Sequence, residues 1–310
     1  MNANRQHLRI ESRYTIWLLV LVAVLLYLPC SANSQTLQGA VDIHVHCDPD
    51  VLPRSLDAID VAREARAAGM RAVVLKNHYV PTASWAFILR KAVPGIEMFG
   101  GIDLNRTMGG INPAAVENMA KVKGGFGRIV WMPTFDAQNQ VRYSKENRPY
   151  VAVSKDGKLL PEVLEVLRII AQHQLILETG HSSGEECLML IRAGKEAGIK
   201  NIVVTHAMAP PVKMNIEQMK QAVAMGAYLE FVYNDLIGPA HTNSIEGYSA
   251  AIRSVGVEHC ILSSDLGQAG NPHPAAGLLE FYKVLHAQGF SDAEIDRMGK
   301  TNPAKVLGLL

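Results

Sequence analysis

Residues 41–50 read VDIHVHCDPD and place two histidines, His44 and His46, one residue apart in a short run of valine and isoleucine. Such a run is typical of a buried β-strand, in which alternate side chains face the same way. The two imidazoles are therefore expected on one face, and Val41, Ile43 and Val45 on the other, packed against outer helices. A single buried histidine is usually a hydrogen-bonded core residue, but two histidines at the end of one strand indicate a functional site.

Seven more runs of this kind follow, and segments with helical spacing separate them. The eight expected strands are residues 41–46, 72–78, 98–105, 128–135, 175–181, 201–207, 227–234 and 260–266. Eight βα units in this length predict an α/β chain folded as a single (β/α)8 TIM barrel, because such barrels typically have about 250 residues. The alternative, an open doubly wound sheet, usually carries a glycine-rich phosphate loop after its first strand, and HCDPDVLPRS is not such a loop.

The helices between these strands have recognisable ends. The first opens on Ser55, and HSSGEE supplies Ser183 with Glu186 three residues later, which is a capping-box pattern. Several helices are followed by glycine, for example Gly198 and Gly226, and glycine just past a helix is a common left-handed stop.

One connection is too long for a simple βα loop. Residues 136–162 follow the fourth strand, and YVAVSKDGKLL alternates around Asp156 and Gly157, which predicts a hairpin. The insertion leaves the C-terminal end of a strand, where barrel enzymes place their active sites, so residues 137–160 are expected to form a lid. A purely structural insertion is the alternative.

The first 34 residues have a different composition. Arg5, Arg9 and Arg13 precede TIWLLVLVAVLLYLP, and the small polar stretch CSANSQ follows. This pattern predicts a signal peptide over residues 1–34 and a barrel over residues 35–310, exported to the periplasm or secreted. The apolar run is shorter than the roughly 20 residues that a span needs, so no membrane attachment is expected after cleavage. A retained membrane anchor is the alternative.

The composition is that of an ordinary globular protein. The chain has 310 residues, of which 48% are hydrophobic and 19% charged, with a formal net charge of +1. A charge this close to zero gives no reason to expect nucleic acid as a partner. A small-molecule substrate is expected instead, and a homo-oligomer is compatible with the sequence.

Side chains that bind metals end three further strands. The fifth, sixth and eighth expected strands finish with His181, His206 and Asp265. All strand ends of a barrel meet at its C-terminal mouth, so these residues should converge with His44 and His46. Imidazoles and a carboxylate suit Zn²⁺ or a similar divalent ion, with one position left for water.

This arrangement resembles the signature of the amidohydrolase superfamily, a group of metal-dependent hydrolases of the TIM-barrel type. The resemblance covers the chain from the first strand to the C-terminus, where TNPAKVLGL is similar to the last helix of those enzymes. It implies that His44, His46 and His181 bind the metal. It also implies that His206 binds a second metal or contacts substrate or water. Asp265 would contact the metal and take the proton from the attacking water, so that His206 and Asp265 are the catalytic residues.

The number of metal ions depends on a bridging ligand. Two-metal members often carry a carboxylated lysine or a glutamate on the fourth strand, and RIVWMPTF offers neither. Lys76 on the second strand could be a carboxylated bridge, or it could face substrate or form a salt bridge. One divalent ion, most simply Zn²⁺, is therefore expected rather than two.

Candidate substrate contacts follow the second, third and seventh strands: His78, Asn105, Arg106 and Tyr233. The planar fork of Arg106 suits a carboxylate, although the same side chain could simply anchor its loop.

The sequence therefore predicts an enzyme that uses a metal-activated water to cleave an amide, cyclic amide, ester or lactone of a small molecule. A non-oxidative decarboxylase of the same superfamily is the alternative enzyme. A phosphoesterase barrel also opens with HxH but usually closes with Asp-x-His, and Gly267 stands where that histidine would be. A non-catalytic metal- or ligand-binding barrel is the last alternative, and Asp265 argues against it because a binding protein needs no proton acceptor there.

Overall fold

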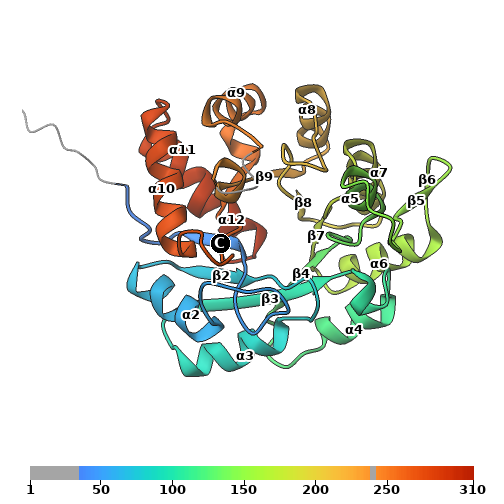
Figure 1. Ribbon diagram of the computed structural model, residues 1–310, viewed down its shortest axis with the longest axis horizontal. Helices are drawn as coiled ribbons and strands as arrows, with labels where there is room; N and C mark the ends of the chain where they lie inside the picture. The colour runs from blue at the N-terminus through green and yellow to red at the C-terminus, as the bar shows by residue number, and fades with distance from the viewer. Residues whose placement is uncertain (1–34, 238–241) are drawn as a thin grey trace, which may run out of the picture. The chain divides into compact units, whose positions relative to one another are not determined.

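The computed structural model describes residues 35–237 and 242–310, so the predicted signal peptide and His241 lie outside the described residues. Eight parallel strands follow one another in a nearly closed barrel with helices between them, which confirms the predicted (β/α)8 fold (Figure 1). The strands are β1 (Val41–Val45), β2 (Ala72–Leu75), β3 (Glu97–Asp103), β4 (Gly127–Trp131), β7 (Ile176–Glu178), β8 (Ile202–Val204), β9 (Tyr228–Val232) and β10 (Cys260–Ser263).

The first and last strands of the barrel meet at its mouth. The Asp265 N–H donates to the carbonyl oxygen of His44 at 2.9 Å, and the His46 N–H donates to that of Leu266 at 2.8 Å. Val45 and Leu266 form an isolated parallel bridge in the same region. These bonds fix the segment after β10 directly beside the end of β1.

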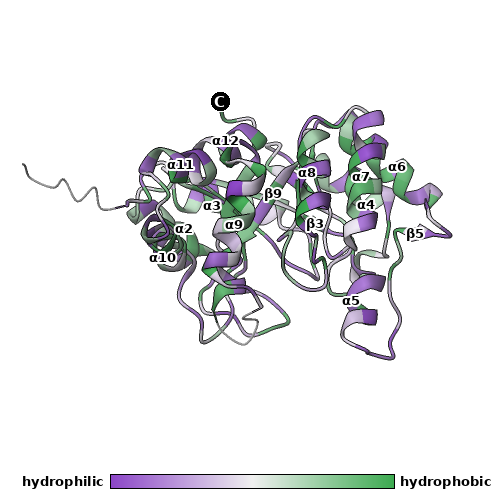
Figure 2. Cartoon of the chain, turned by 90° about the horizontal axis from the view of Figure 1, so that it is seen from above, coloured by the Kyte–Doolittle hydropathy of each residue, from purple (hydrophilic) through white to green (hydrophobic). Residues whose placement is uncertain are grey.

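Hydrophobic and hydrophilic residues alternate along the helices around the barrel (Figure 2), and the buried helix residues are mostly apolar. They are α2 (Ala58–Ala67), α3 (Ala83–Ala92), α4 (Pro113–Ala120), α6 (Pro161–Gln172), α7 (Gly184–Glu196), α8 (Ile216–Ala224), α9 (Ile245–Val255), α10 (Pro274–Ala287), α11 (Asp292–Asp296) and α12 (Asn302–Val306), with α5 (Gln138–Tyr143) in the insertion. None of the helices in the described part of the chain has the length and apolar character that crossing a membrane requires.

Helix caps follow the sequence pattern with one correction. Ser183 and Glu186 form the predicted capping box of α7. Helix α2 begins at Ala58 rather than on Ser55, because Asp57 is its N-cap and accepts hydrogen bonds from the N–H groups of the first turn.

The barrel interior corrects a second expectation. Val41 and Ile43 belong to the hydrophobic cluster inside the barrel, so the prediction that they face the outer helices is wrong. The pairing of β1 with β2 shifts between Asp42 and Val45, which leaves one extra residue in β1. This bulge turns both Ile43 and His44 toward the interior. Residues of α12 join the same cluster, so the last helix closes the end of the barrel opposite the mouth.

The insertion after β4 contains the predicted hairpin. Its strands, β5 (Ser154–Lys155) and β6 (Lys158–Leu159), pair antiparallel. Asp156 and Gly157 connect them with φ values of 50° and 72°, as a tight two-residue hairpin turn requires.

Candidate metal centre

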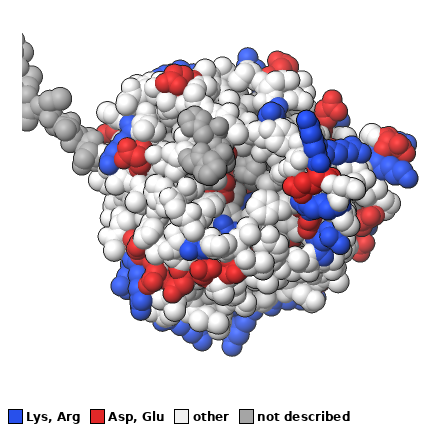
Figure 3. Space-filling model, in the orientation of Figure 1, with Lys and Arg blue, Asp and Glu red and all other residues white. Residues whose placement is uncertain are grey.

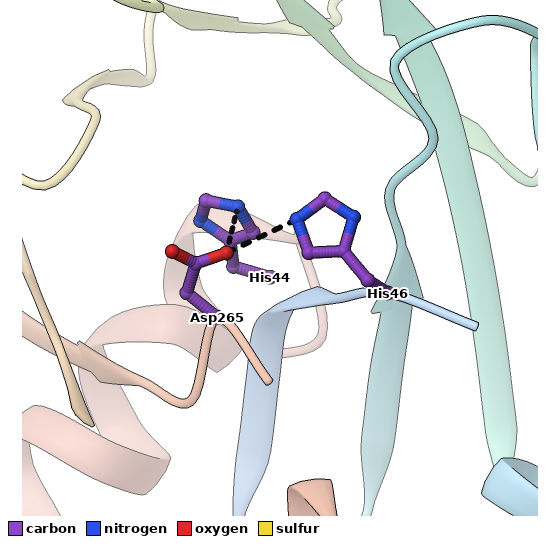
Figure 4. Close-up of side chains that lie close together, drawn as sticks. All are labelled: His44, His46 and Asp265. Atoms are coloured by element: carbon purple, nitrogen blue, oxygen red, sulfur yellow. Dashed lines mark hydrogen bonds and ion pairs between the residues drawn. The ribbon is translucent and has the colours of Figure 1, made fainter. Parts of the chain in front are cut away.

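Three of the predicted ligands lie together at the mouth of the barrel. One carboxylate oxygen of Asp265 is 3.0 Å from Nε2 of His44 and 3.0 Å from Nε2 of His46. Figure 4 shows the three side chains pointing toward one another from β1 and from the segment after β10. Their ligand atoms all lie within 4.8 Å of one another, so they could hold a metal ion. Two imidazoles and a carboxylate are a donor set that Zn²⁺ favours.

A buried glutamate orients the first histidine. Nδ1 of His44 lies 3.2 Å from the carboxylate of Glu230 on β9, which leaves Nε2 to face Asp265. Glu230 also accepts a hydrogen bond from the His206 N–H at 3.1 Å. Such a carboxylate behind a metal-binding histidine fixes the ring and its tautomer. The sequence analysis did not single out Glu230, although a lone glutamate within AYLEFV was a usable signal.

His181 and His206 line the same cavity as these three residues. Their ring centroids are 4.9 Å apart, and the His206 ring lies 6.0 Å from that of His44. Nδ1 of His181 is 2.8 Å from Oε1 of Gln140, which comes from α5 of the insertion. Nδ1 of His206 is buried and has no hydrogen-bond partner among the described residues. A buried polar atom of this kind is free to meet a ligand.

Backbone strain accompanies the site. His206 and Asp265 have φ values of 26° and 49°, in a region that residues with side chains rarely adopt. Each costs on the order of 1–3 kcal/mol and persists only where surrounding structure imposes it. Each residue lies two positions past the end of a barrel strand, which points to a functional use of its orientation.

Two further ionisable residues near His44, Lys76 and Glu178, are buried. Nζ of Lys76 lies 3.1 Å from Nε2 of His44 and 5.2 Å above the ring of Trp131. Glu178 accepts hydrogen bonds from Trp131 Nε1 at 2.7 Å and from the Thr205 hydroxyl at 2.9 Å. Burial, together with the charge of Glu230, raises the pKa of Glu178 to about 8, so this carboxyl group is neutral at pH 7.

The acidic groups beside His44 stay ionised. Burial alone would raise the pKa of Glu230, but the neighbouring His44 holds it below its usual value. In the same way, His44 and His46 outweigh burial and hold the pKa of Asp265 well below its usual value. Burial lowers the pKa of His44, but Asp265 and Glu230 outweigh it and raise this pKa to about 10. Metal binding at His44 would therefore displace a proton.

A cavity of about 300 Å³ opens at the centre, and its walls include all five predicted ligands together with Lys76 and His78. The His78 ring stacks on Phe135 at 3.9 Å and on His46 at 4.8 Å. Its Nδ1 lies 2.9 Å from the carboxylate of Asp103, which fixes the ring.

The other three predicted substrate contacts do not line this cavity. Asn105 is buried and donates to the Thr134 hydroxyl at 2.8 Å, so it ties loops together. Arg106 lies in a separate surface hollow beside Tyr150. Tyr233 turns into the core, where its ring lies 5.7 Å from that of Phe281.

Comparison with known proteins gives the family. A model of a family of unknown function, DUF6282, matches residues 39–230. The chain belongs to this family. No curated protein matches it.

Solved structures with the same fold include two hydrolases. An organophosphorus hydrolase from Deinococcus radiodurans is 15% identical over 89% of this chain and 93% of that chain, with a TM-score of 0.56. An amidohydrolase from Pseudomonas aeruginosa is 13% identical over 87% of this chain and 97% of that chain, with a TM-score of 0.60. At these identities the similarity shows the TIM-barrel fold that amidohydrolases share.

The structure around Gly267 leaves no room for the Asp-x-His ending that the alternative, histidine-rich phosphoesterase barrel usually has. Gly267 has a φ of 127°, and a Cβ there would lie 1.9 Å from the carbonyl oxygen of His46. No side chain fits at this position without moving the backbone of β1. The third histidine of an Asp-x-His pattern therefore has no place after Asp265.

Proposed function

We propose that this DUF6282 chain is a metal-dependent hydrolase that cleaves an amide, cyclic amide, ester or lactone bond of a small molecule. The observation that carries the proposal is the convergence of His44, His46 and Asp265 at the mouth of a TIM barrel. A divalent ion at this position, most simply one Zn²⁺, lowers the pKa of a water molecule toward 7 and polarises a carbonyl oxygen.

The residues present fit such an ion. Glu230 engages Nδ1 of His44, so Nε2 is the nitrogen left to bind. Nε2 of His46 faces the same carboxylate oxygen. His181 supplies a third imidazole to the cavity, and Gln140 holds its ring.

Asp265 is the group placed to move the proton. Its carboxylate is ionised, and its second oxygen accepts a hydrogen bond from Asn234 Nδ2 at 3.3 Å. A carboxylate in this state can accept the proton of the attacking water and pass it to the leaving group. Burial lowers the pKa of His206 to about 4, so its ring is neutral at pH 7 and holds one proton for a substrate oxygen.

The size and charge of the surface favour a small substrate. A cavity of about 300 Å³ is at the lower end of the range for small-molecule sites. Basic and acidic side chains are interspersed over the described residues on the face that Figure 3 shows, unlike the continuous basic surface that nucleic acid binding uses. Export, which rests on residues 1–34 of the sequence, is part of the proposal.

The test is product analysis with the full-length chain after loading with Zn²⁺ or Mn²⁺. A panel of N-acyl amino acids, cyclic amides, esters and lactones is incubated with wild type, Asp265→Asn and the exposed control Asp60→Asn. We expect acid products without CO₂, and a loss of at least about 100-fold in Asp265→Asn only. Release of CO₂ would show that the reaction is a decarboxylation and not a hydrolysis. Metal-loaded protein without turnover on any compound would contradict an enzyme of this class.

A further inference from the structure

One buried cation in the cavity wall has no part in the proposed chemistry. Arg54 lies between β1 and α2, lines the cavity and exposes only 3% of its side chain. Its Nε donates to Oδ2 of Asp50 at 2.7 Å. Its Nη2 is buried, and nothing within residues 35–237 and 242–310 hydrogen-bonds to it. Buried polar atoms without a partner are rare in folded proteins, so this one calls for a ligand.

The loop holds the Arg54 side chain in place. The other oxygen of Asp50 accepts two backbone N–H groups of the same loop. Arg54 itself forms an antiparallel bridge with Gln268, and the Ser55 N–H donates to the carbonyl oxygen of Gly267 at 2.8 Å. Asp50 therefore holds the guanidinium, and the backbone contacts hold its loop, before any ligand arrives, which lowers the entropy cost of binding.

The guanidinium lies close to the candidate metal centre. Arg54, His46 and His78 all line one cavity of about 300 Å³. A ligand that reaches Arg54 is thus within the same small cavity as His46.

Asp50 already pairs with Nε of Arg54, and the described acidic groups that line the cavity leave Nη2 without a partner. Asp265 is paired with His44 and His46. Asp235 accepts a hydrogen bond from the Tyr248 hydroxyl at 2.7 Å, and burial raises its pKa to about 8, so it is neutral at pH 7. Among the described residues that line the cavity, Arg54 therefore faces no unpaired carboxylate.

We propose that Arg54 binds a carboxylate of the substrate. The molecule cleaved is then an anionic amide, ester or lactone, with its acid group on Arg54 and its scissile bond beside His44, His46 and Asp265. A planar guanidinium matches a planar carboxylate in shape and charge, and a single fork of this kind suits one acid group. This inference deepens the proposed function and rests on it.

Binding of two matched probes tests the inference directly. N-acetylglycine carries a carboxylate where N-isobutylacetamide carries an uncharged isopropyl group of similar shape. Titration calorimetry on metal-loaded wild type should show at least about tenfold tighter binding of the acid, as a charge-assisted hydrogen bond gives. Arg54→Gln should lose this preference, Arg54→Lys should keep part of it, and the exposed control Arg63→Gln should keep all of it. An acid preference that survives in Arg54→Gln, or its absence in wild type, would overturn the inference.

Two further measurements keep the outcomes distinct. Removal of metal with EDTA separates binding at Arg54, which should persist, from a carboxylate bound to the metal, which should vanish and would contradict the inference. A chain that binds the acid through Arg54 but holds no metal would refute the proposed hydrolase and leave the Arg54 site intact. If Arg54→Gln misfolds because Asp50 loses its partner, the double variant Asp50→Asn/Arg54→Gln restores charge balance for the same titration.

Discussion

Nζ of Lys76 lies 3.1 Å from Nε2 of His44, the nitrogen that also faces Asp265. The fourth strand offers no bridging carboxylate, and an uncarboxylated Lys76 cannot bridge two metal ions, so the site should hold one ion. We expect Lys76→Met and the exposed control Lys220→Met to contain the same single divalent ion per chain as wild type by elemental analysis. Two ions in wild type that fall to one in Lys76→Met would instead identify Lys76 as a carboxylated bridge.

Glu230 should tune metal affinity without touching the metal. Its carboxylate lies 3.2 Å from Nδ1 of His44 and fixes the ring. We expect Glu230→Gln to weaken Zn²⁺ binding about 10–100-fold in a competition with a chelating dye, as loss of such a partner typically does. Glu217→Gln, on the exposed surface of α8, is the matched control. Equal affinity in both variants would show that Glu230 does not orient His44.

Gln140 links the insertion to the metal centre through Nδ1 of His181 at 2.8 Å. We expect Gln140→Leu to lower metal affinity by about tenfold, because the His181 ring loses its orientation. The chelator competition is repeated with Gln221→Leu, on the exposed surface of α8, as control. If Gln140→Leu binds metal like wild type while His181→Ala does not, the insertion has no role in holding the ligand.

The contribution of Asp235 to stability should fall as pH rises. Burial raises its pKa from an ordinary 3.8 to about 8, and the hydroxyl of Tyr248 lies 2.7 Å from its carboxyl group. At Asp235 the folded protein therefore keeps a proton that the unfolded chain releases, so this contribution declines between about pH 4 and pH 8. The slope is at most about 1.4 kcal/mol per pH unit for one such proton.

Asp235→Asn removes this titration. Urea unfolding of EDTA-treated protein at pH 5 and pH 8 should show a smaller decline in the free energy of unfolding for Asp235→Asn than for wild type. The exposed control Asp60→Asn should follow wild type. Parallel declines in all three proteins would contradict a neutral Asp235 in the folded state.

The sequence predicted the barrel well because its evidence is local. Most strands are apolar runs rich in valine and isoleucine, and helical segments with recognisable ends follow them. His44, His46 and Asp265 could be placed together because a barrel brings all strand ends to one mouth. The alternation of side chains along a strand predicted the wrong face for Ile43, because the bulge in β1 depends on how this strand pairs with β2.

The rest of the site depends on contacts between distant segments. Glu230 meets His44 across 186 positions of sequence, and no local pattern announces that pair. Tyr233 follows a strand but turns into the core, because the short helix Tyr233–Leu236 begins there. Arg54 became a candidate only when its neighbours were known, since an unpartnered nitrogen cannot be read from a loop sequence.

The most direct measurement is the metal content of the purified chain. Wild type, His44→Ala and the exposed control His286→Ala are loaded with Zn²⁺, desalted and analysed for metal per chain. We expect about one ion in wild type and in His286→Ala, and almost none in His44→Ala. A zinc site has few protein ligands, so the loss of one of them strongly weakens binding. Wild-type protein that holds no ion after loading with Zn²⁺ or Mn²⁺ would contradict the metal centre.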